Sequence, residues 1–227
     1  MNRIIFSILL LFASAGFAAP ELVYWNSDAG KILRARISPD ADYWPLSATF
    51  VLQNTQTYCS VASAVTVLNA MPIRKPVDPV YAPTPYFTQR NFFTPEVNRI
   101  ITPDTVLNMG MTRDQMAGTL QQHGVRVENI AGDTLSVDAL RSLLKTRLGD
   151  DGRFVLANYL RSSLGQEDGG HWSALAAFDV ASDRVLILDV ARYKYPPTWV
   201  DIGSLRRAIA TLDSTSNKPR GLIIVSQ

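Results

Sequence analysis

The scarcity of cysteine and histidine most constrains this chain, because it removes two common ways of stabilising a fold. Its 227 residues include one cysteine, Cys59, and two histidines, His123 and His171. A lone cysteine cannot form an internal disulfide, and these three residues are too few for a structural zinc site of the Cys/His kind. A hydrophobic core must therefore hold the fold.

The composition fits a folded chain with such a core. Hydrophobic residues make up 47% and charged residues 19% of the sequence, which excludes a disordered or fibrous chain. The length suits one domain. The net charge is only +2, which offers no electrostatic basis for binding nucleic acid.

The first residues have the layout of a secretory signal. A weakly basic start at Arg3 is followed by an apolar run over residues 4–12 and by small residues up to Ala18, which predicts a signal peptide over residues 1–18. The alternative, a membrane anchor, is disfavoured because the run is shorter than the ~20 residues that span a bilayer. We expect an exported domain over residues 19–227. A free thiol in an oxidising compartment is exposed to oxidation, so Cys59 calls for a functional reason.

Hydrophobic periodicity and turn residues predict an α+β fold with a mainly antiparallel sheet. Residues 21–45 are expected to wrap the core or form an edge, and seven prolines in residues 72–105 predict a long excursion with short helical pieces at most. Helices are predicted over 59–71, from Thr112 to before Gly124, from Ser136 to Leu148, and over 203–212. Strands are predicted over 125–130, 154–160 and 221–225, with a hairpin over 172–180 and 185–190.

Cys59 opens one of the predicted helices, with Thr57 in the N-cap region. A helix N-terminus favours an anion and lowers the pKa of a thiol placed there. A neighbouring imidazolium would lower it further. His123, beside Gly124 at a helix end, is better interpreted as a solvated histidine that stabilises the helix dipole. His171 is the stronger partner, because a flexible Gly169-Gly170 approach delivers it to an apolar strand.

Asp189 ends the second strand of the predicted hairpin, so it should lie across from His171 and orient the imidazole. A turn-capping role for Asp189 is the alternative. Gln53, six residues before Cys59, could supply its side-chain NH₂ to an oxyanion hole together with the Cys59 N–H, although Gln56 competes for this role. The order Gln, Cys, His, Asp is that of papain-like thiol enzymes.

At this point the sequence resembles the phytochelatin synthase family, the glutathione γ-glutamylcysteinyltransferases. The resemblance runs from about Leu52 to Val225 and is carried by QNTQTYCSVASAVTVLNA (53–70), YFTQRNFF (86–93), NYLRSSLGQEDGGHWSALAAFD (158–179) and LILDVARYKYPPTWV (186–200). It implies a papain-like fold in which a helical part bearing the cysteine packs against a sheet bearing the histidine and aspartate.

The resemblance also implies roles for individual residues. The catalytic residues match Cys59, His171 and Asp189, and the oxyanion glutamine matches Gln53. The residues that bind the γ-glutamyl group look like Asn158, Asp213 and Arg220, and an arginine implicated in substrate handling matches Arg161. Each of these four could instead have a structural role: a buried Asn, a turn Asp, a solvated loop Arg and a rim salt bridge. Ser60, Trp172 and Thr198 depart from the common family pattern of Gly, Phe and His.

The activity implied is cleavage of the Cys–Gly bond of glutathione through a γ-Glu-Cys acyl-enzyme on Cys59. Because the Cys-rich C-terminal domain of the plant relatives is missing, we expect a short bacterial type, exported to the periplasm, that passes the acyl group mainly to water and less to another glutathione. No cofactor is required, no nucleic acid or membrane partner is expected, and homodimerisation stays open. Cadmium or a similar ion could act as an activator or as a metal–glutathione substrate, which would link the protein to the heavy-metal response.

Two other functions stay open. One is an exported papain-like peptidase that accepts ordinary α-peptides, which a comparison of γ-glutamyl and α-peptide substrates would separate. The other is a non-catalytic protein that binds glutathione or a thiol peptide. An unperturbed thiol pKa near ~8.5 at Cys59 would favour the binding protein.

Overall fold

The computed structural model describes residues 21–149 and 152–227. The predicted signal peptide over residues 1–18 lies outside them. Within the described ranges, every helix is too short or too polar to cross a bilayer.

A seven-stranded sheet forms the centre of the molecule, and all of its neighbouring strands are antiparallel. The strand order is β1-β6-β5-β4-β3-β9-β2. The strands are β1 (Val23–Tyr24), β2 (Arg126–Ala131), β3 (Arg153–Leu160), β4 (Gly170–Asp179), β5 (Arg184–Leu188), β6 (Thr198–Asp201) and β9 (Gly221–Ser226). A separate small hairpin pairs β7 (Leu212–Asp213) with β8 (Lys218–Pro219).

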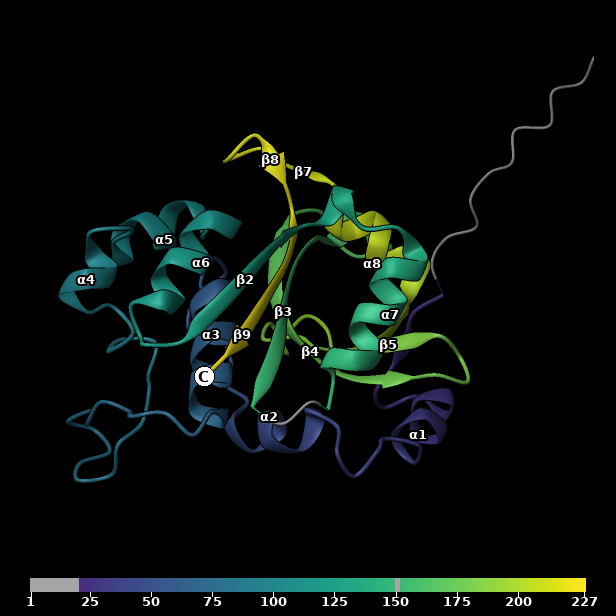
Figure 1. Cartoon of the computed structure of the whole chain (residues 1–227), viewed down its shortest axis with the longest axis horizontal. Coiled ribbons are helices and arrows are strands. Elements are labelled where there is room, and N and C mark those ends of the chain that lie inside the picture. The colour runs from purple at the N-terminus through teal and green to yellow at the C-terminus, as the bar shows by residue number, and fades with distance from the viewer. Residues whose placement is uncertain (1–20, 150–151) are drawn as a thin grey trace, which may run out of the picture.

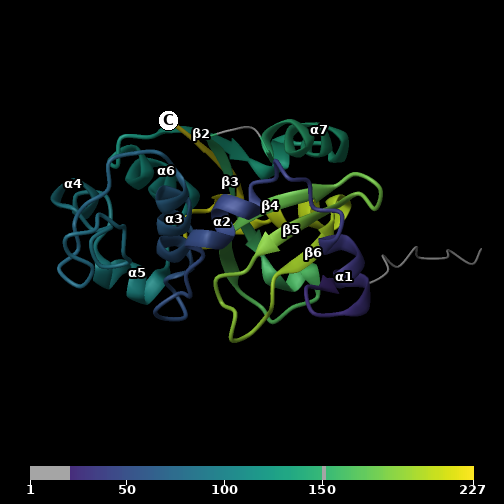
Figure 2. The ribbon, with the colours of Figure 1, turned by 90° about the horizontal axis from the view of Figure 1, so that it is seen from below.

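Helices cover both faces of the sheet (Figure 1). One side carries α3 (Cys59–Ala70), α4 (Pro95–Asn98), α5 (Pro103–Met109) and α6 (Arg113–Gln121), and the other carries α7 (Val137–Arg147) and α8 (Ile202–Ile209). Of the two N-terminal helices, α2 (Tyr43–Thr49) packs against α3 and α1 (Asp28–Arg34) packs against β1, and Figure 2 shows both from below.

Strand alternation divides the core into two clusters, one on each face. On β3, Phe154 and Leu156 belong to the cluster around α3, whereas Val155 and Ala157 belong to the cluster around α7 and α8. Successive side chains of a strand point to opposite faces, so a central strand covered on both sides is apolar throughout. This explains why the run over 154–157 reads as continuously hydrophobic.

The helix α3 is the central element on its side of the sheet. Its residues from Cys59 to Asn69 are all buried, and it packs against β4 and α2. Small residues such as Ala62 and Ser63 allow this close approach, and the Ser63 hydroxyl donates a hydrogen bond to the Trp172 carbonyl of β4 at 3.1 Å. The fold thereby fixes the helix that begins with Cys59 against the strand that begins beside His171.

The predicted α+β class with an antiparallel sheet is confirmed, together with the four main helices, the hairpin β4–β5 and the terminal strand. Residues 21–45 form an edge through β1, as expected. The strand β6 and the hairpin β7–β8 were not predicted. β6 follows two prolines, Pro196 and Pro197, and carries only four residues, too few for alternation to be visible.

Candidate active site

Cys59 is the first residue of α3, as the sequence predicts, but the cap differs. The N-cap position is Tyr58, which makes no side-chain capping hydrogen bond. The prediction of Thr57 as the cap was wrong, and its hydroxyl instead donates to the Leu107 carbonyl at 2.9 Å. The first turn is therefore left without a side-chain oxygen on its N–H groups, and its positive end faces the thiol.

His171 lies against Cys59 and Asp189, and all three side chains are buried. The imidazole is close enough to interact electrostatically with the thiol of Cys59, and its Nε2 lies 2.9 Å from Oδ1 of Asp189. The register explains the pairing: Ala174 of β4 faces Leu188 of β5, so Asp189, directly after β5, lies near the start of β4. The predicted juxtaposition of these residues is present.

Asp189 also has the turn-capping contact that we weighed as an alternative. Its Oδ1 accepts a hydrogen bond from the Ala191 N–H at 2.8 Å. One carboxylate thus holds both the histidine and the turn that follows β5, so the two interpretations are compatible.

Arg161 also holds the Asp189 carboxylate, with contacts to both of its oxygens. Its Nη2 donates to Oδ1 of Asp189 at 2.9 Å and its Nη1 lies 2.8 Å from Oδ2. The guanidinium is buried, donates to Gln166 Oε1 at 2.7 Å and lies 5.0 Å from the centre of the Tyr195 ring. A two-pronged arginine–carboxylate pair fixes geometry as well as charge. Arg161 therefore contacts the histidine's partner and is not the rim salt bridge that we considered.

These charges set the ionisation of the site. Burial alone would raise the pKa of the Cys59 thiol, but the charge and hydrogen bond of His171, the Trp172 N–H and the charge of Arg161 outweigh it and lower that pKa. Burial opposes the imidazolium of His171, but Cys59 and Asp189 raise its pKa. His171 and Arg161 hold the pKa of Asp189 well below its usual range against the effect of burial. The site favours a thiolate–imidazolium pair.

Gln53 is buried near the turn after β5. Its backbone N–H donates to the Val190 carbonyl at 3.1 Å, and its Nε2 donates to the Tyr193 hydroxyl at 2.8 Å. Gln56, the competing candidate, lines the pocket next to Cys59. The assignment of the oxyanion role to Gln53 stays a prediction.

A pocket opens beside Cys59 and brings together three of the residues predicted to bind substrate. Asn158, Asp213 and Arg220 all line it, together with Gly170 and Trp172. Arg220 donates from Nη1 to Asn158 Oδ1 at 2.9 Å, and its Nη2 lies 3.6 Å from Asp213 Oδ1. The fourth predicted residue, Arg161, is not among the lining residues of this pocket.

The Arg220 guanidinium lies close to the backbone of Gly170, an approach that only a residue without a side chain allows. A Cβ atom on Gly170 would lie 2.4 Å from Nη1 of Arg220, far inside van der Waals contact. Burial lowers the pKa of Arg220 although Asp213 and Cys59 act in the opposite direction. The Nε atom of Arg220 is buried without a hydrogen-bond partner, so the protein leaves one donor of this cation unsatisfied, while the residue itself lines the pocket.

His123 differs from its prediction as a solvated, dipole-stabilising histidine. α6 ends at Gln121 with Gln122 as its C-cap, so His123 takes the C′ position, and Gly124, with a φ of 79°, follows one residue later. The His123 ring lies 5.2 Å from that of Phe87 and 4.8 Å from that of Phe92. Burial lowers its pKa to about 4, so it is neutral and acts as an aromatic packing residue.

Several contacts of the site were not predicted. The Tyr193 hydroxyl accepts a hydrogen bond from Gln53, and Arg161 contacts the Tyr195 ring and the Gln166 side chain. The Trp172 Nε1 donates to the Met111 carbonyl at 2.9 Å. The signal available was the cluster of polar and aromatic residues in SSLGQEDGG and in ARYKYPP, which flank the predicted hairpin. Within residues 21–149 and 152–227, no group of three or more His, Cys, Asp or Glu side chains is placed to hold a metal ion.

Together, these observations define a class: an antiparallel α+β protein in which a buried cysteine at a helix start meets a histidine–aspartate pair on the sheet, beside a pocket with its own arginine and aspartate. The chain belongs to the phytochelatin synthase family, whose family model matches residues 17–222.

Curated relatives support this membership. The chain is 28% identical over 212 residues to glutathione gamma-glutamylcysteinyltransferase 1 of Triticum aestivum, covering 92% of this chain and 41% of the relative. It is 29% identical over 185 residues to glutathione gamma-glutamylcysteinyltransferase 3 of Lotus japonicus, covering 82% and 37%. It is 24% identical over 208 residues to the Schizosaccharomyces pombe enzyme of the same name, covering 90% and 49%. The chain thus spans less than half the length of these relatives.

Proposed function

We propose that this protein is a glutathione γ-glutamylcysteinyltransferase that also hydrolyses glutathione, with Cys59 as its nucleophile. The observation that carries the proposal is the buried Cys59–His171–Asp189 arrangement, which opens onto a pocket lined by Asn158 and Arg220. Family membership supplies the substrate class, because the relatives are named for this reaction.

The first step forms a thioester. The Cys59 thiolate attacks the carbonyl carbon of the Cys–Gly peptide bond, and the C–N bond breaks. His171 gives its proton to the nitrogen of the departing glycine, while Asp189 keeps the imidazole oriented. The Cys59 N–H and the Gln53 amide are proposed to stabilise the oxyanion, an effect of roughly 3 kcal/mol per donor in comparable enzymes.

The second step releases the acyl group. Water attacks the thioester carbonyl and passes a proton to His171, the Cys59 thiolate leaves, and γ-Glu-Cys is released. If the amino group of another glutathione attacks in place of water, the product is a phytochelatin. We propose that water is the main acceptor, and that the enzyme requires no resident cofactor. A soft metal ion would enter bound to the glutathione thiolate, as part of the substrate.

The pocket residues fit the γ-glutamyl end of glutathione, which carries one carboxylate and one ammonium group. The planar fork of Arg220 suits the carboxylate, and Asp213 suits the ammonium. Asn158 already accepts a hydrogen bond from Arg220, so it fixes the guanidinium and leaves its own amide NH₂ for the ligand. This assignment accounts for a buried arginine that is only partly satisfied by the protein.

Incubation with glutathione, with and without cadmium, tests the proposal when the products are identified by mass spectrometry. We expect glycine and γ-Glu-Cys to dominate. Abundant longer γ-Glu-Cys oligomers would overturn the preference for water, and the absence of glycine release would overturn the activity. A parallel assay on α-peptides excludes a general peptidase if these stay uncleaved.

We also propose that the protein is exported to a bacterial periplasm after removal of residues 1–18. Expression of the full chain in a bacterium, followed by fractionation and N-terminal sequencing, tests this. A periplasmic chain that begins at Ala19 is expected, and a cytoplasmic chain that begins at Met1 would contradict it.

A further inference from the structure

The motif YFTQRNFF (86–93) is one of the most distinctive stretches of the chain, yet none of its residues enters the chemistry at Cys59. Five of its residues, over 86–90, line a separate cavity of about 480 Å³. A volume of this size lies within the range of small-molecule sites, roughly 300–1,000 Å³. Neither Cys59 nor His171 lines it.

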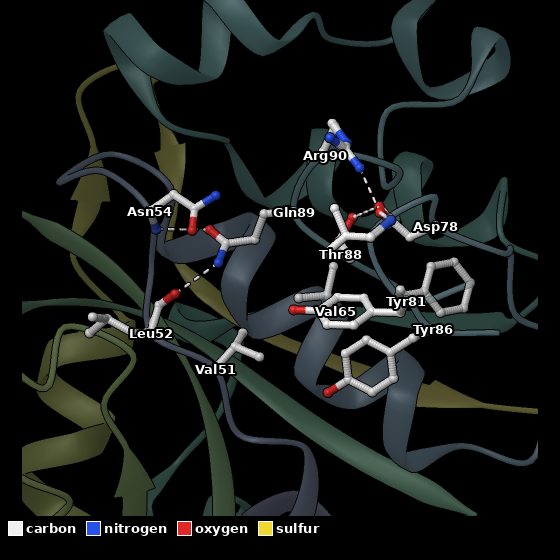
Figure 3. A pocket seen from close by; sticks show the side chains of 12 residues that line it. Val51, Leu52, Asn54, Val65, Asp78, Tyr81, Tyr86, Thr88, Gln89 and Arg90 are labelled. Carbon is white, nitrogen blue, oxygen red and sulfur yellow. Dashed lines mark hydrogen bonds and ion pairs between the residues drawn. The ribbon is translucent and has the colours of Figure 1, made fainter. Parts of the chain in front are cut away.

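Hydrogen bonds fix the inner wall of the cavity to α3. Asn69 of α3 donates from Nδ2 to the Phe87 carbonyl at 2.8 Å and accepts from the Phe87 N–H at 2.9 Å, which ties the motif to the helix that begins at Cys59. Val51 and Val65 supply aliphatic wall, and Figure 3 shows Tyr81 and Tyr86 on one side of the cavity and Gln89, Leu52 and Asn54 on the other.

The walls favour an aromatic ligand. The rings of Tyr81 and Tyr86 lie 5.7 Å apart at 73°, an edge-to-face pair that leaves ring surface free to contact a third ring. Tyr81 remains 52% exposed, so an apolar ligand here would cover aromatic surface that now faces solvent.

The charges of the cavity cancel within it. Asp78 is fully buried and accepts from Arg90 Nη2 at 2.5 Å, from the Thr88 hydroxyl at 2.7 Å and from the Val80 N–H at 2.9 Å. Because Asp78 and Arg90 neutralise each other, the cavity offers no unbalanced charge to an ion. The ligand class it fits is therefore uncharged, with a polar group directed to the exposed Asn54 end.

One side chain links this cavity to the proposed oxyanion glutamine. Gln89 donates from Nε2 to the Leu52 carbonyl at 2.8 Å and accepts from the Asn54 N–H at 2.9 Å. These contacts bracket Gln53 on both sides. A ligand that moves Gln89 would strain or break these two hydrogen bonds to the backbone on either side of Gln53.

We propose that this cavity, lined by Val51, Val65, Tyr81, Tyr86 and Gln89, is a second binding site for an uncharged aromatic small molecule, and that Gln89 transmits its occupancy to Gln53. The binding itself is independent of the proposed function. Only its effect on catalysis would rest on the role proposed for Gln53.

Nuclear magnetic resonance on the ¹⁵N-labelled mature chain tests the proposal with benzamide as the probe and without any activity assay. We expect saturable shifts of the Leu52, Asn54 and Gln89 amides and of the Gln53 side-chain NH₂. Tyr81→Ala should weaken binding by about fivefold, whereas Trp44→Ala, which removes another half-exposed aromatic, should leave it unchanged.

Charge and coupling are tested separately. Benzoate should bind more weakly than benzamide, and tighter binding of benzoate would overturn the uncharged class. In Gln89→Ala, benzamide should still bind but the Gln53 shift should disappear. Shifts that are absent or non-saturable in the unaltered protein, or equal binding by Tyr81→Ala, would overturn the site. A Gln53 signal that does not move in the unaltered protein would overturn the coupling.

Discussion

Two groups of charged residues flank Cys59, and they are paired to different degrees. Arg161, Asp189 and His171 are interlocked at 2.8 to 2.9 Å and buried. Arg220 is 3.6 Å from Asp213 and keeps an unpartnered Nε. The side chains of the first group are bound to one another, whereas Arg220 and Asp213 are more loosely paired and line the pocket beside Cys59. We therefore expect the first group to position the catalytic residues and the second to bind substrate, so each should control a different kinetic constant.

The largest effect is expected at Asp189. Asp189→Asn removes the charge that supports the His171 imidazolium and should lower kcat for glycine release by about 10³- to 10⁴-fold, with KM changed little. Asp179→Asn is a matched control, because Asp179 is a buried aspartate paired with Arg36 at 2.7 Å at the other end of the same hairpin. A comparable loss of kcat in the control would show that the Asp189 effect is structural.

Breaking the Arg161–Asp189 pair should have the next largest effect. Arg161→Met leaves the buried carboxylate with only His171 as a charged partner, which is expected to lower kcat by about 10- to 100-fold and also to lower the melting temperature. Arg141→Met, which breaks pairs with Asp138 and Asp183 elsewhere, is the control and should leave kcat intact. If Arg161→Met instead raised KM alone, Arg161 would contact substrate and not position Asp189.

The binding group is expected to control KM. Arg220→Gln would remove the charged hydrogen bond that we propose to the substrate carboxylate, a loss of about 1.5–3 kcal/mol, so KM for glutathione should rise roughly 10- to 150-fold. Arg99→Gln, at an arginine whose side chain is 74% exposed, should change neither constant. Steady-state kinetics decide between the two groups, since a fall in kcat with unchanged KM would contradict a binding role for Arg220.

A smaller effect is expected from moving Arg220 without removing it. In Gly170→Ala the new Cβ would overlap Nη1 of Arg220, so the guanidinium must shift and KM should rise by about tenfold, less than for Arg220→Gln. Gly118→Ala, where a Cβ would meet an Ile100 side-chain carbon at an ordinary 3.4 Å, is the control. An unchanged KM in Gly170→Ala would show that the position of this guanidinium is not critical.

The smallest differences are expected in pH profiles. Because the pKa of Cys59 is lowered and that of His171 is raised, the thiolate–imidazolium pair should persist below the ordinary thiol pKa of ~8.5 and above the ordinary histidine pKa of ~6.5. Alkylation of Cys59 followed against pH reports the thiolate. Asp189→Asn should move the upper limb of the glycine-release profile to lower pH, since His171 then loses its proton earlier. A limb that stays in place would contradict the pairing.

The sequence predicts the Arg161–Asp189–His171 group better than it predicts the surroundings of that group. The pairing of His171 with Asp189 follows from one hairpin, so local strand patterns suffice to predict it. The contact of Gln53 with Tyr193, 140 positions away, needs the tertiary structure. The predictions of a Thr57 cap and of a solvated His123 were wrong for the same reason. In both cases, partners from distant segments outweighed local preferences.

The binding group could be named only through the family resemblance. Asn158, Asp213 and Arg220 come from β3, from β7 and from the residue between β8 and β9, and no periodicity links them. The small hairpin that brings Asp213 toward Arg220 has two residues in each strand, which is too short to be recognised by alternation.

Acyl transfer through Cys59 is tested most directly by the mass of the intact protein after brief mixing with glutathione and acid quenching, followed by peptide mapping. We expect a γ-glutamylcysteinyl adduct on Cys59 that survives a non-nucleophilic reductant and is absent in Cys59→Ser. An adduct of whole glutathione that the reductant removes would be a mixed disulfide and would contradict acyl transfer. An unmodified Cys59 with continuing glycine release would contradict Cys59 as the nucleophile.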